Sequence, residues 1–158
     1  YTNNLRDYSI FWSMKNSFYK KLEDFYLQAP LNQFIYHGTT IKVTQKRAEI
    51  SVPIESKYFH GFHAMHGSVY FKMLDDSAFF AAQSIVKDVF LLTAHFEISF
   101  TKPVTSGIIT ATGTLNSFHE REYKAESKLH DSNNNLIGYG HGIFKKSRLR
   151  FSESLEFK

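Results

Sequence analysis

The sequence predicts an α+β fold in which an antiparallel β-sheet wraps around one long, mostly apolar helix. The first observation is that residues 68–86 contain neither Pro nor Gly and are apolar enough to lie inside a protein. The second is that segments on both sides of this run alternate apolar and polar residues, which is typical of strands with one buried face. The order helix, two strands, long helix and four strands favours one sheet packed on that helix.

The composition indicates one domain without a membrane span. The chain has 158 residues, of which 42% are hydrophobic, and this suits a single domain with a core. We expect an N-terminal helical extension over residues 1–30, the main domain over 31–147 and a C-terminal tail over 148–158. The absence of Cys excludes thiolate chemistry and favours a reducing, cytoplasmic setting. Because no apolar run reaches the roughly 18 to 20 residues of a membrane span, no membrane partner is expected.

The chain is moderately basic, with a net charge of +4 and a pI near 9.2. This balance suits a polyanionic partner such as a nucleic acid or the phosphates of a coenzyme. No nucleic-acid partner is expected, because the positive charge is not interleaved with aromatic residues along any one strand. Part of the excess charge lies in a cluster near the C-terminus that we interpret as a solvated tail: Lys145, Lys146, Arg148 and Arg150.

The first half of the chain predicts a helix, a hairpin and a loop. Residues 8–28 carry apolar side chains three or four positions apart, which is typical of an amphipathic helix, and Pro30 ends it. Residues 34–44 and 47–54 are rich in Thr, Ile and Val and predict two strands of a hairpin. Residues 55–65 have no clean period and are expected to form a loop that leads into the central helix.

Four strands are predicted after the central helix, over residues 92–101, 109–116, 123–129 and 136–144. Each alternates apolar and polar positions, and Pro103 ends the first of them. The last strand places three glycines on one face: Gly138, Gly140 and Gly142. This bare face offers room for another backbone or a flat ligand, or it marks a bulge.

Two adjacent acidic residues interrupt the apolar central helix, which Ser68 is expected to cap. A carboxylate taken out of water is costly unless it is partnered or used, so Asp75 and Asp76 are candidates for a functional site. At about 100° per residue, Asp76 shares a polar stripe with Lys72, whereas Asp75 lies among apolar neighbours. We therefore interpret Asp76 as a solvated carboxylate paired with Lys72, and Asp75 as the functional one.

The start of the same helix offers a second feature. Backbone N–H groups at Gly67 and Ser68 lie at a positive helix terminus, which stabilises an oxyanion or a polarised carbonyl. Asp75 lies eight residues further on, roughly 12 Å along the helix axis, so one helix cannot easily bring both features to the same atom. A two-fold dimer with antiparallel helices and composite sites would bring them together.

These residues carry a resemblance to a known family. The run His66-Gly67-Ser68, Asp75 nine residues after His66, an Ala-rich helix and a strand ending in Lys102-Pro103-Val104 resemble the hotdog-fold thioesterases, in particular the phenylacetyl-CoA thioesterase-like (PaaI-like) branch. The resemblance covers about residues 34–144. It implies the hotdog fold, a homodimer or dimer of dimers, and hydrolysis of an acyl- or aryl-CoA thioester to the free acid and CoA. It implies no cofactor, since coenzyme A enters as part of the substrate.

The resemblance also implies roles for individual residues. The Gly67 N–H would polarise the thioester carbonyl, and Asp75 of the partner subunit would activate water or attack as a nucleophile. A shift of one residue in the alignment would give this role to Asp76 instead. His60 stands where the family commonly has Asn, Ser68 replaces a second Gly, and Thr93 stands where some family members carry a water-orienting hydroxyl. The expected catalytic residues are His60, His66, Gly67, Asp75 and Thr93, and the expected substrate-binding residues are Ser68, Tyr70 and Met73.

Two alternative functions stay open, and no metal site is expected. A hotdog dehydratase or hydratase would pair His60 or His66 with a carboxylate. A non-catalytic acyl-CoA-binding protein would have lost the catalytic residues through the changes at His60 and Ser68. His60, His63 and His66 are three apart, a spacing that lacks the two-plus-two pattern of strong metal motifs.

Overall fold

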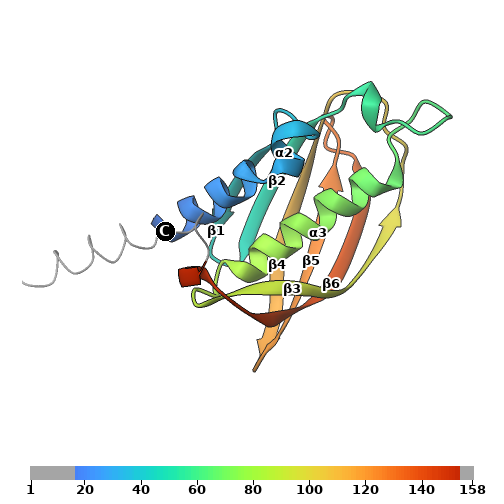
Figure 1. Ribbon diagram of the computed structural model, residues 1–158. Helices are drawn as coiled ribbons and strands as arrows, with labels where there is room; N and C mark the ends of the chain where they lie inside the picture. The colour runs from blue at the N-terminus through green and yellow to red at the C-terminus, as the bar shows by residue number, and fades with distance from the viewer. Residues whose placement is uncertain (1–16, 154–158) are drawn as a thin grey trace, which may run out of the picture.

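The computed structural model describes residues 17–153 and shows a six-stranded antiparallel sheet with a long helix lying across it (Figure 1). The helix, α3, spans Gly67–Gln83. The strands are β1 Thr40–Thr44, β2 Arg47–Pro53, β3 Val89–Phe100, β4 Ile108–His119, β5 Glu122–His130 and β6 Leu136–Arg150. Their order in the sheet is β1-β2-β4-β5-β6-β3, which confirms the predicted α+β class.

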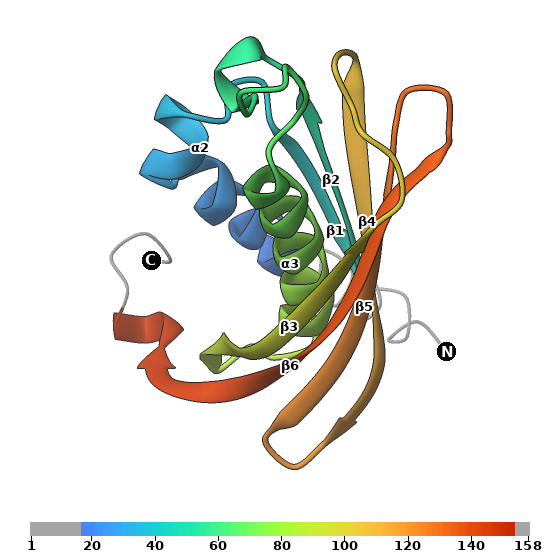
Figure 2. The ribbon, with the colours of Figure 1, turned by 90° about the vertical axis from the view of Figure 1, so that its right-hand side faces the viewer.

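The sheet curves around α3, so that the helix occupies its concave face (Figure 2). Small residues allow this close approach: a Cβ atom at Gly113 of β4 would lie 2.0 Å from the Ser77 carbonyl oxygen. The Ser77 hydroxyl lies 2.6 Å from the hydroxyl of Ser127 in β5, and this hydrogen bond satisfies two buried polar groups. The backbone of α3 therefore rests directly on β4 and β5.

The N-terminal extension differs from the prediction after residue 28. Residues 17–28 are helical, and Leu22 and Tyr26 are buried there, while the predicted helical residues 8–16 lie outside the described part. Pro30 opens a second helix, α2 Pro30–Phe34, because the first position of a helix needs no N–H donor. The strand predicted over residues 34–44 is therefore wrong in its first part, and β1 begins at Thr40.

The ends of α3 also differ from the prediction. His66 rather than Ser68 is the N-cap, since His66 Nδ1 accepts a hydrogen bond of 3.1 Å from the Ser68 N–H. The helix ends at Gln83, and the Gln83 side chain is buried. Its amide donates to the Val86 carbonyl at 2.8 Å and accepts from the Leu91 N–H at 2.8 Å. Gln83 thus ties the end of the helix to the start of β3.

A β-bulge changes which residues of β3 face the helix. The pairing of β3 with β6 shifts register between Thr93 and His95, which leaves Ala94 as an extra residue. The alternation predicted from residue 92 is therefore wrong before the bulge: Leu92 is 55% exposed, and Leu91 is buried. Thr93 consequently lies on the same side as Leu91, toward α3.

The glycine face of β6 is filled by the protein itself. A Cβ atom at Gly142 would lie 2.3 Å from Cδ2 of Phe96, and one at Gly140 would lie 2.8 Å from Cε1 of the same ring. Backbone carbonyl oxygens of β3 come equally close: the one of His95 would lie 2.5 Å from a Cβ at Gly142, and the one of Glu97 would lie 2.6 Å from a Cβ at Gly140. The backbone of β3 and its Phe96 ring therefore take the room beside these two glycines, in agreement with the expectation of a close backbone.

The last strand extends further than expected. β6 runs to Arg150, beyond the domain boundary expected at residue 147, and the 3-10 helix Phe151–Glu153 follows it. Phe151 is buried, so this part of the expected tail packs on the domain. Among the described helices, none is long and apolar enough to cross a membrane.

The two edges of the sheet have different surroundings. At the β1 edge, the Glu23 side chain is nearly buried, and its Oε1 accepts a hydrogen bond of 2.8 Å from the Val43 N–H. A side chain in this place hinders pairing of β1 with another strand. The opposite edge is formed by β3, the strand that carries Thr93.

Candidate active site

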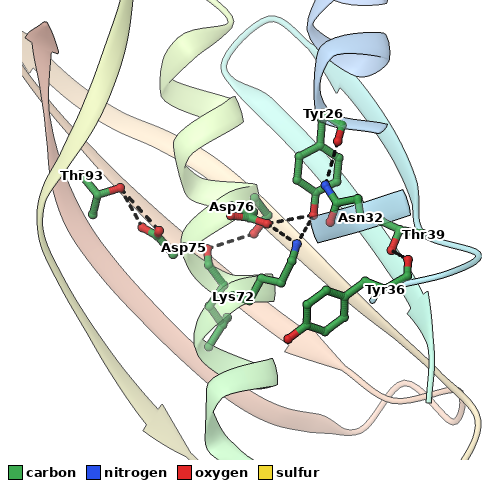
Figure 3. Close-up of polar contacts among 10 residues, drawn as sticks. Tyr26, Asn32, Tyr36, Thr39, Lys72, Asp75, Asp76 and Thr93 are labelled. Atoms are coloured by element: carbon green, nitrogen blue, oxygen red, sulfur yellow. Dashed lines mark hydrogen bonds and ion pairs between the residues drawn. The ribbon is translucent and has the colours of Figure 1, made fainter. Parts of the chain in front are cut away.

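Helix α3 directs its two adjacent carboxylates to different neighbours (Figure 3). Asp75 points toward β3, where the Thr93 hydroxyl lies 3.1 Å from Asp75 Oδ1 and 3.4 Å from Oδ2. Asp76 points toward the N-terminal extension and meets Tyr26. Adjacent helix positions differ by about 100°, so one helix can present two carboxylates to two environments.

Asp75 is half-buried, and its surroundings favour the protonated form more than water does. Burial raises the pKa of the Asp75 carboxyl to about 6, and the negative charge of Asp76 acts in the same direction. The hydrogen bond from Thr93 and the charge of Lys72 act in the opposite direction. A carboxylate with this pKa is mostly ionised at neutral pH and is basic enough to take a proton from a reacting water molecule.

Asp76 forms the expected pair with Lys72, but the pair is not solvated. Lys72 Nζ lies 2.6 Å from Asp76 Oδ2, and the two side chains are only 10% and 25% exposed. The Tyr26 hydroxyl donates to the same Oδ2 at 2.8 Å. The prediction of a solvated carboxylate is therefore wrong, because the N-terminal extension folds over the polar stripe of α3.

A pocket of about 400 Å³ lies beside the first turn of α3. Its lining includes His60, Gly67, Tyr70, Phe100 and Lys102. None of the side chains or carbonyls between residues 17 and 153 accepts a hydrogen bond from the Gly67 N–H. This N–H belongs to the first turn of the helix, where donors have no partner within the helix. The pocket can therefore hold a carbonyl oxygen against a positive helix terminus.

The two predicted catalytic histidines, one of which lines this pocket, form hydrogen bonds with residues two positions further along the chain. His60 lines the pocket, and its Nδ1 accepts from the Phe62 N–H at 3.1 Å. His66 caps α3 through its Nδ1, which also lies 2.8 Å from the Ser68 hydroxyl. Within the described chain, no group of three or more His, Asp or Glu side chains is arranged to hold a metal ion.

The predicted substrate-binding residues have different surroundings. Tyr70 is almost fully buried, lines the pocket, and donates its hydroxyl to the Lys102 carbonyl at 2.8 Å. Ser68 is exposed at the start of α3. Met73 is 1% exposed and belongs to the hydrophobic core, so the structure does not bring it to the pocket.

Phe71 is a candidate that the sequence reasoning missed. It lies four residues after Gly67 and four before Asp75, so all three share one side of α3. The ring is 41% exposed and packs edge-on against Phe96 at 5.7 Å between centroids. Its spacing of four residues from both Gly67 and Asp75 is the signal in the sequence that could have identified Phe71 as a candidate. Phe71 forms an apolar surface between the helix terminus and the carboxylate.

Asp75 and Thr93 do not line the pocket that contains Gly67. Within one chain, the structure thus brings together Asp75 with Thr93, and His60 with Gly67 and Tyr70, as two separate groups. This separation agrees with the spacing of about 12 Å expected along the helix.

An antiparallel sheet wrapped around one long central helix defines the hotdog fold, and the described chain has this architecture. The model of the thioesterase superfamily matches residues 62–136, a little under half of the chain. The matched segment contains α3, most of the residues that line the pocket, and the strands β3 to β5. The resemblance to hotdog-fold thioesterases seen in the sequence is thereby confirmed.

Solved structures show the same fold at low sequence identity. The PaaI protein from the phenylacetic acid degradation operon of E. coli is 13% identical, with a TM-score of 0.76 over 86% of this chain and 97% of that one. A thioesterase from Haemophilus influenzae is 14% identical, with a TM-score of 0.68 over 77% of this chain and 85% of that one. A mutant thioesterase from Pseudomonas aeruginosa is 10% identical, with a TM-score of 0.71 over 82% and 93%. No curated protein gives a significant sequence match.

Proposed function

We propose that this protein hydrolyses an acyl- or aryl-CoA thioester to the free acid and coenzyme A. The observation that carries the proposal is Asp75, a half-buried carboxylate whose pKa is raised to about 6 and which has one hydroxyl partner, Thr93. A purely structural carboxylate at this depth would be expected to have several donors, as Asp76 does. The match of residues 62–136 to the thioesterase superfamily supports the reaction class.

In the proposed reaction, the thioester carbonyl oxygen accepts a hydrogen bond from the Gly67 N–H at the positive end of α3. Asp75 of the partner subunit takes a proton from a water molecule, and the water oxygen attacks the carbonyl carbon. The intermediate then breaks its C–S bond, and the departing CoA thiolate takes the proton held by Asp75. In the nucleophilic variant, an Asp75 oxygen attacks the carbonyl carbon, the C–S bond breaks, and CoA leaves as a thiolate that takes a proton from solvent. Water then hydrolyses the resulting anhydride to the free acid and the Asp75 carboxylate. Neither route requires a metal or another cofactor.

A homodimer is part of the proposal because Gly67 and Asp75 belong to separate groups within one chain. Two antiparallel α3 helices would place each Gly67 beside the Asp75 of the other subunit. The sheet edges favour one arrangement: Glu23 occupies the edge of β1, whereas β3 carries Thr93 at the opposite edge. Association along β3 would bring the Asp75–Thr93 pair to the interface. A dimer of such dimers is the larger assembly expected.

The surroundings of the pocket support a CoA thioester as the substrate. The exposed ring of Phe71 offers an apolar surface to the acyl or aryl group. Lys102 at the pocket offers a positive charge to a CoA phosphate. These contacts favour no particular acyl chain length.

The first experiment measures release of free thiol from a panel of CoA thioesters with short, long and aromatic acyl groups. We expect thiol release with at least one of them. Asp75→Asn is expected to lower the rate by about 10²- to 10⁴-fold, the range of a lost general base. Asp76→Asn is the matched control, with the same chemical change at the next position, and is expected to keep most of the activity because Asp76 faces the extension.

Three outcomes would contradict this assignment. Equal loss in both variants, with both folded by circular dichroism, would remove the role of Asp75. Binding of acyl-CoA without thiol release would favour a non-catalytic acyl-CoA-binding protein. Loss of water from a 3-hydroxyacyl-CoA without thiol release would favour a dehydratase, although His60 and His66 both contact loop and helix-cap groups here rather than a carboxylate.

A further inference from the structure

Lys72, Tyr26 and Asp76 form a closed triangle of polar contacts beside Asp75 (Figure 3). Lys72 Nζ donates to Asp76 Oδ2 at 2.6 Å and to the Tyr26 hydroxyl oxygen at 2.8 Å, and that hydroxyl donates to the same Oδ2 at 2.8 Å. The ring centroids of Tyr26 and Tyr36 each lie 4.8 Å from Lys72 Nζ. The N-terminal extension and the segment after α2 therefore enclose a lysine–aspartate pair on α3.

A stabilising role alone is a weak explanation for this triangle. The cost of removing both charges from water offsets much of their attraction, and apolar side chains of similar size often stabilise a protein as well or better. The extension could therefore cover this side of α3 with apolar residues only. What an ion pair adds is one positive and one negative charge fixed next to Asp75.

We propose that Lys72 is a positioning residue for the Asp75 carboxylate: together with Tyr26 it holds Asp76 toward the N-terminal extension and balances its charge, which leaves Asp75 ionised and turned toward Thr93. The inference rests on the proposed function only in giving Asp75 a reaction to perform. It makes the N-terminal extension a part of the catalytic apparatus, although no residue in the described part of the extension, 17–30, forms a hydrogen bond with Asp75.

Few titratable or charged groups of the described chain act on Asp75. From α3, the charge of Asp76 raises the pKa of Asp75 and the charge of Lys72 lowers it. From β3, the facing group is the Thr93 hydroxyl, which does not titrate in this range. From the extension, Tyr26 contacts Asp76, and burial raises the pKa of Tyr26 well above its ordinary value, so its hydroxyl remains a donor. Loss of the Lys72 charge therefore leaves the repulsion by Asp76 uncompensated.

The test is a ¹³C NMR titration of the Asp75 carboxyl in the full chain, with the signal assigned by its absence in Asp75→Asn. Lys72→Met keeps a long apolar stem and is expected to raise the midpoint by about one pH unit, a tenfold change in the ionisation equilibrium. Lys72→Arg keeps the charge and is expected to restore the native midpoint. Lys20→Met is the matched control, since Lys20 forms the same i,i+4 pair with Asp24 at 2.6 Å on the exposed face of the extension.

An unchanged midpoint in folded Lys72→Met, or an equal shift in Lys20→Met, overturns the inference. If Lys72→Met does not fold, the double variant Lys72→Met with Asp76→Asn removes both charges and is expected to titrate at or below the native midpoint. A midpoint above the native one in that variant also overturns it. The titration needs no substrate, so a shift without any thiol release would contradict the proposed function alone. Thiol release with an unmoved titration would contradict the role of Lys72 alone.

Discussion

Asp75 and Asp76 are neighbours with the same side chain, and their surroundings give them different chemistry. Asp76 accepts from Tyr26 and Lys72, so its oxygen has strong donors. Asp75 accepts a hydrogen bond from the Thr93 hydroxyl, and its partial burial raises the pKa of its carboxyl. A carboxylate that is left with weak partners in a folded protein is a candidate for function, because stability alone would select better partners.

This difference predicts how stability depends on pH at the residue scale. The pKa of Asp75 is raised from its ordinary 3.8 to about 6 in the folded state, so the folded protein disfavours the ionised form. Protonated Asp75 makes its full contribution to the free energy of unfolding below about pH 4, and this contribution is lost as the pH rises through about 6. Asp75→Asn is therefore expected to increase the free energy of unfolding at pH 7.5 by about 1–2 kcal/mol, after allowance for partial exposure, and to have little effect at pH 3.5.

Urea unfolding followed by circular dichroism at the two pH values measures this effect. Asp88→Asn serves as a control of opposite sign. Burial raises the pKa of Asp88, but hydrogen bonds from the backbone and from Lys146 outweigh it and hold that pKa below its ordinary value. This substitution is expected to give no gain at pH 7.5. A loss of stability in Asp75→Asn at pH 7.5 would contradict the assigned ionisation of Asp75.

At the scale of elements, α3 combines the core of the domain with both parts of the proposed site. Its inner side rests on β4 and β5 through Ser77 and Gly113. Its first turn opens into the pocket, and its middle carries the carboxylates. Because a helix is rigid over this length, the distance between Gly67 and Asp75 is set by the helix rise rather than by loop flexibility.

The role of the α3 terminus predicts a contrast between two substitutions at Gly67. Proline is well tolerated as the first residue of a helix, where its ring replaces the N–H and adds a Cβ in the same place as that of Ala. His66 already has the extended backbone, with φ −66° and ψ 145°, that a residue before Pro adopts. Gly67→Pro is therefore expected to lower thiol release by about 10²-fold, as for a lost oxyanion donor, with little loss of helix content.

Gly67→Ala is the matched variant that keeps the N–H. Its Cβ atom would lie 3.1 Å from Cζ of Phe100, a side chain that is 57% exposed and able to shift. Most of the activity should remain. Steady-state rates with the best substrate of the panel measure both variants, and equal activity of the Pro and Ala variants would remove the N–H from the mechanism.

At the scale of the whole molecule, the composite site predicts complementation between two inactive variants. Asp75→Asn and Gly67→Pro damage different halves of each site. If every site combines Gly67 of one subunit with Asp75 of the other, a mixed dimer has one site with both defects and one intact site. Refolding an equal mixture should therefore restore about one quarter of the native activity, given random pairing of subunits.

Light scattering at micromolar concentration measures the assembly, with a dimer or a dimer of dimers expected. The control for complementation is a mixture of Asp75→Asn with native protein, in which activity should fall with the share of variant chains. A strict monomer, or no recovery in the refolded mixture of two variants, would contradict the composite site.

The sequence by itself determined the helix and strands whose buried residues recur at regular spacing, and it singled out Asp75. The alternation of apolar residues predicted the hairpin and the four strands after the helix, and the uninterrupted apolar run predicted α3. Asp75 stood out because a carboxylate in such a run is costly. These features depend on local spacing, which a sequence displays directly.

Only the tertiary structure decided which side chains meet. The bulge at Ala94 turns Thr93 toward Asp75, and no local pattern marks a bulge that β6 imposes through pairing. Tyr26 covers Lys72 and Asp76, which lie about fifty positions further along the chain. Periodicity shows whether one face of a helix or strand is polar or apolar. The segment that covers this face comes from a distant part of the sequence, and only the packing of the folded chain decides which segment it is.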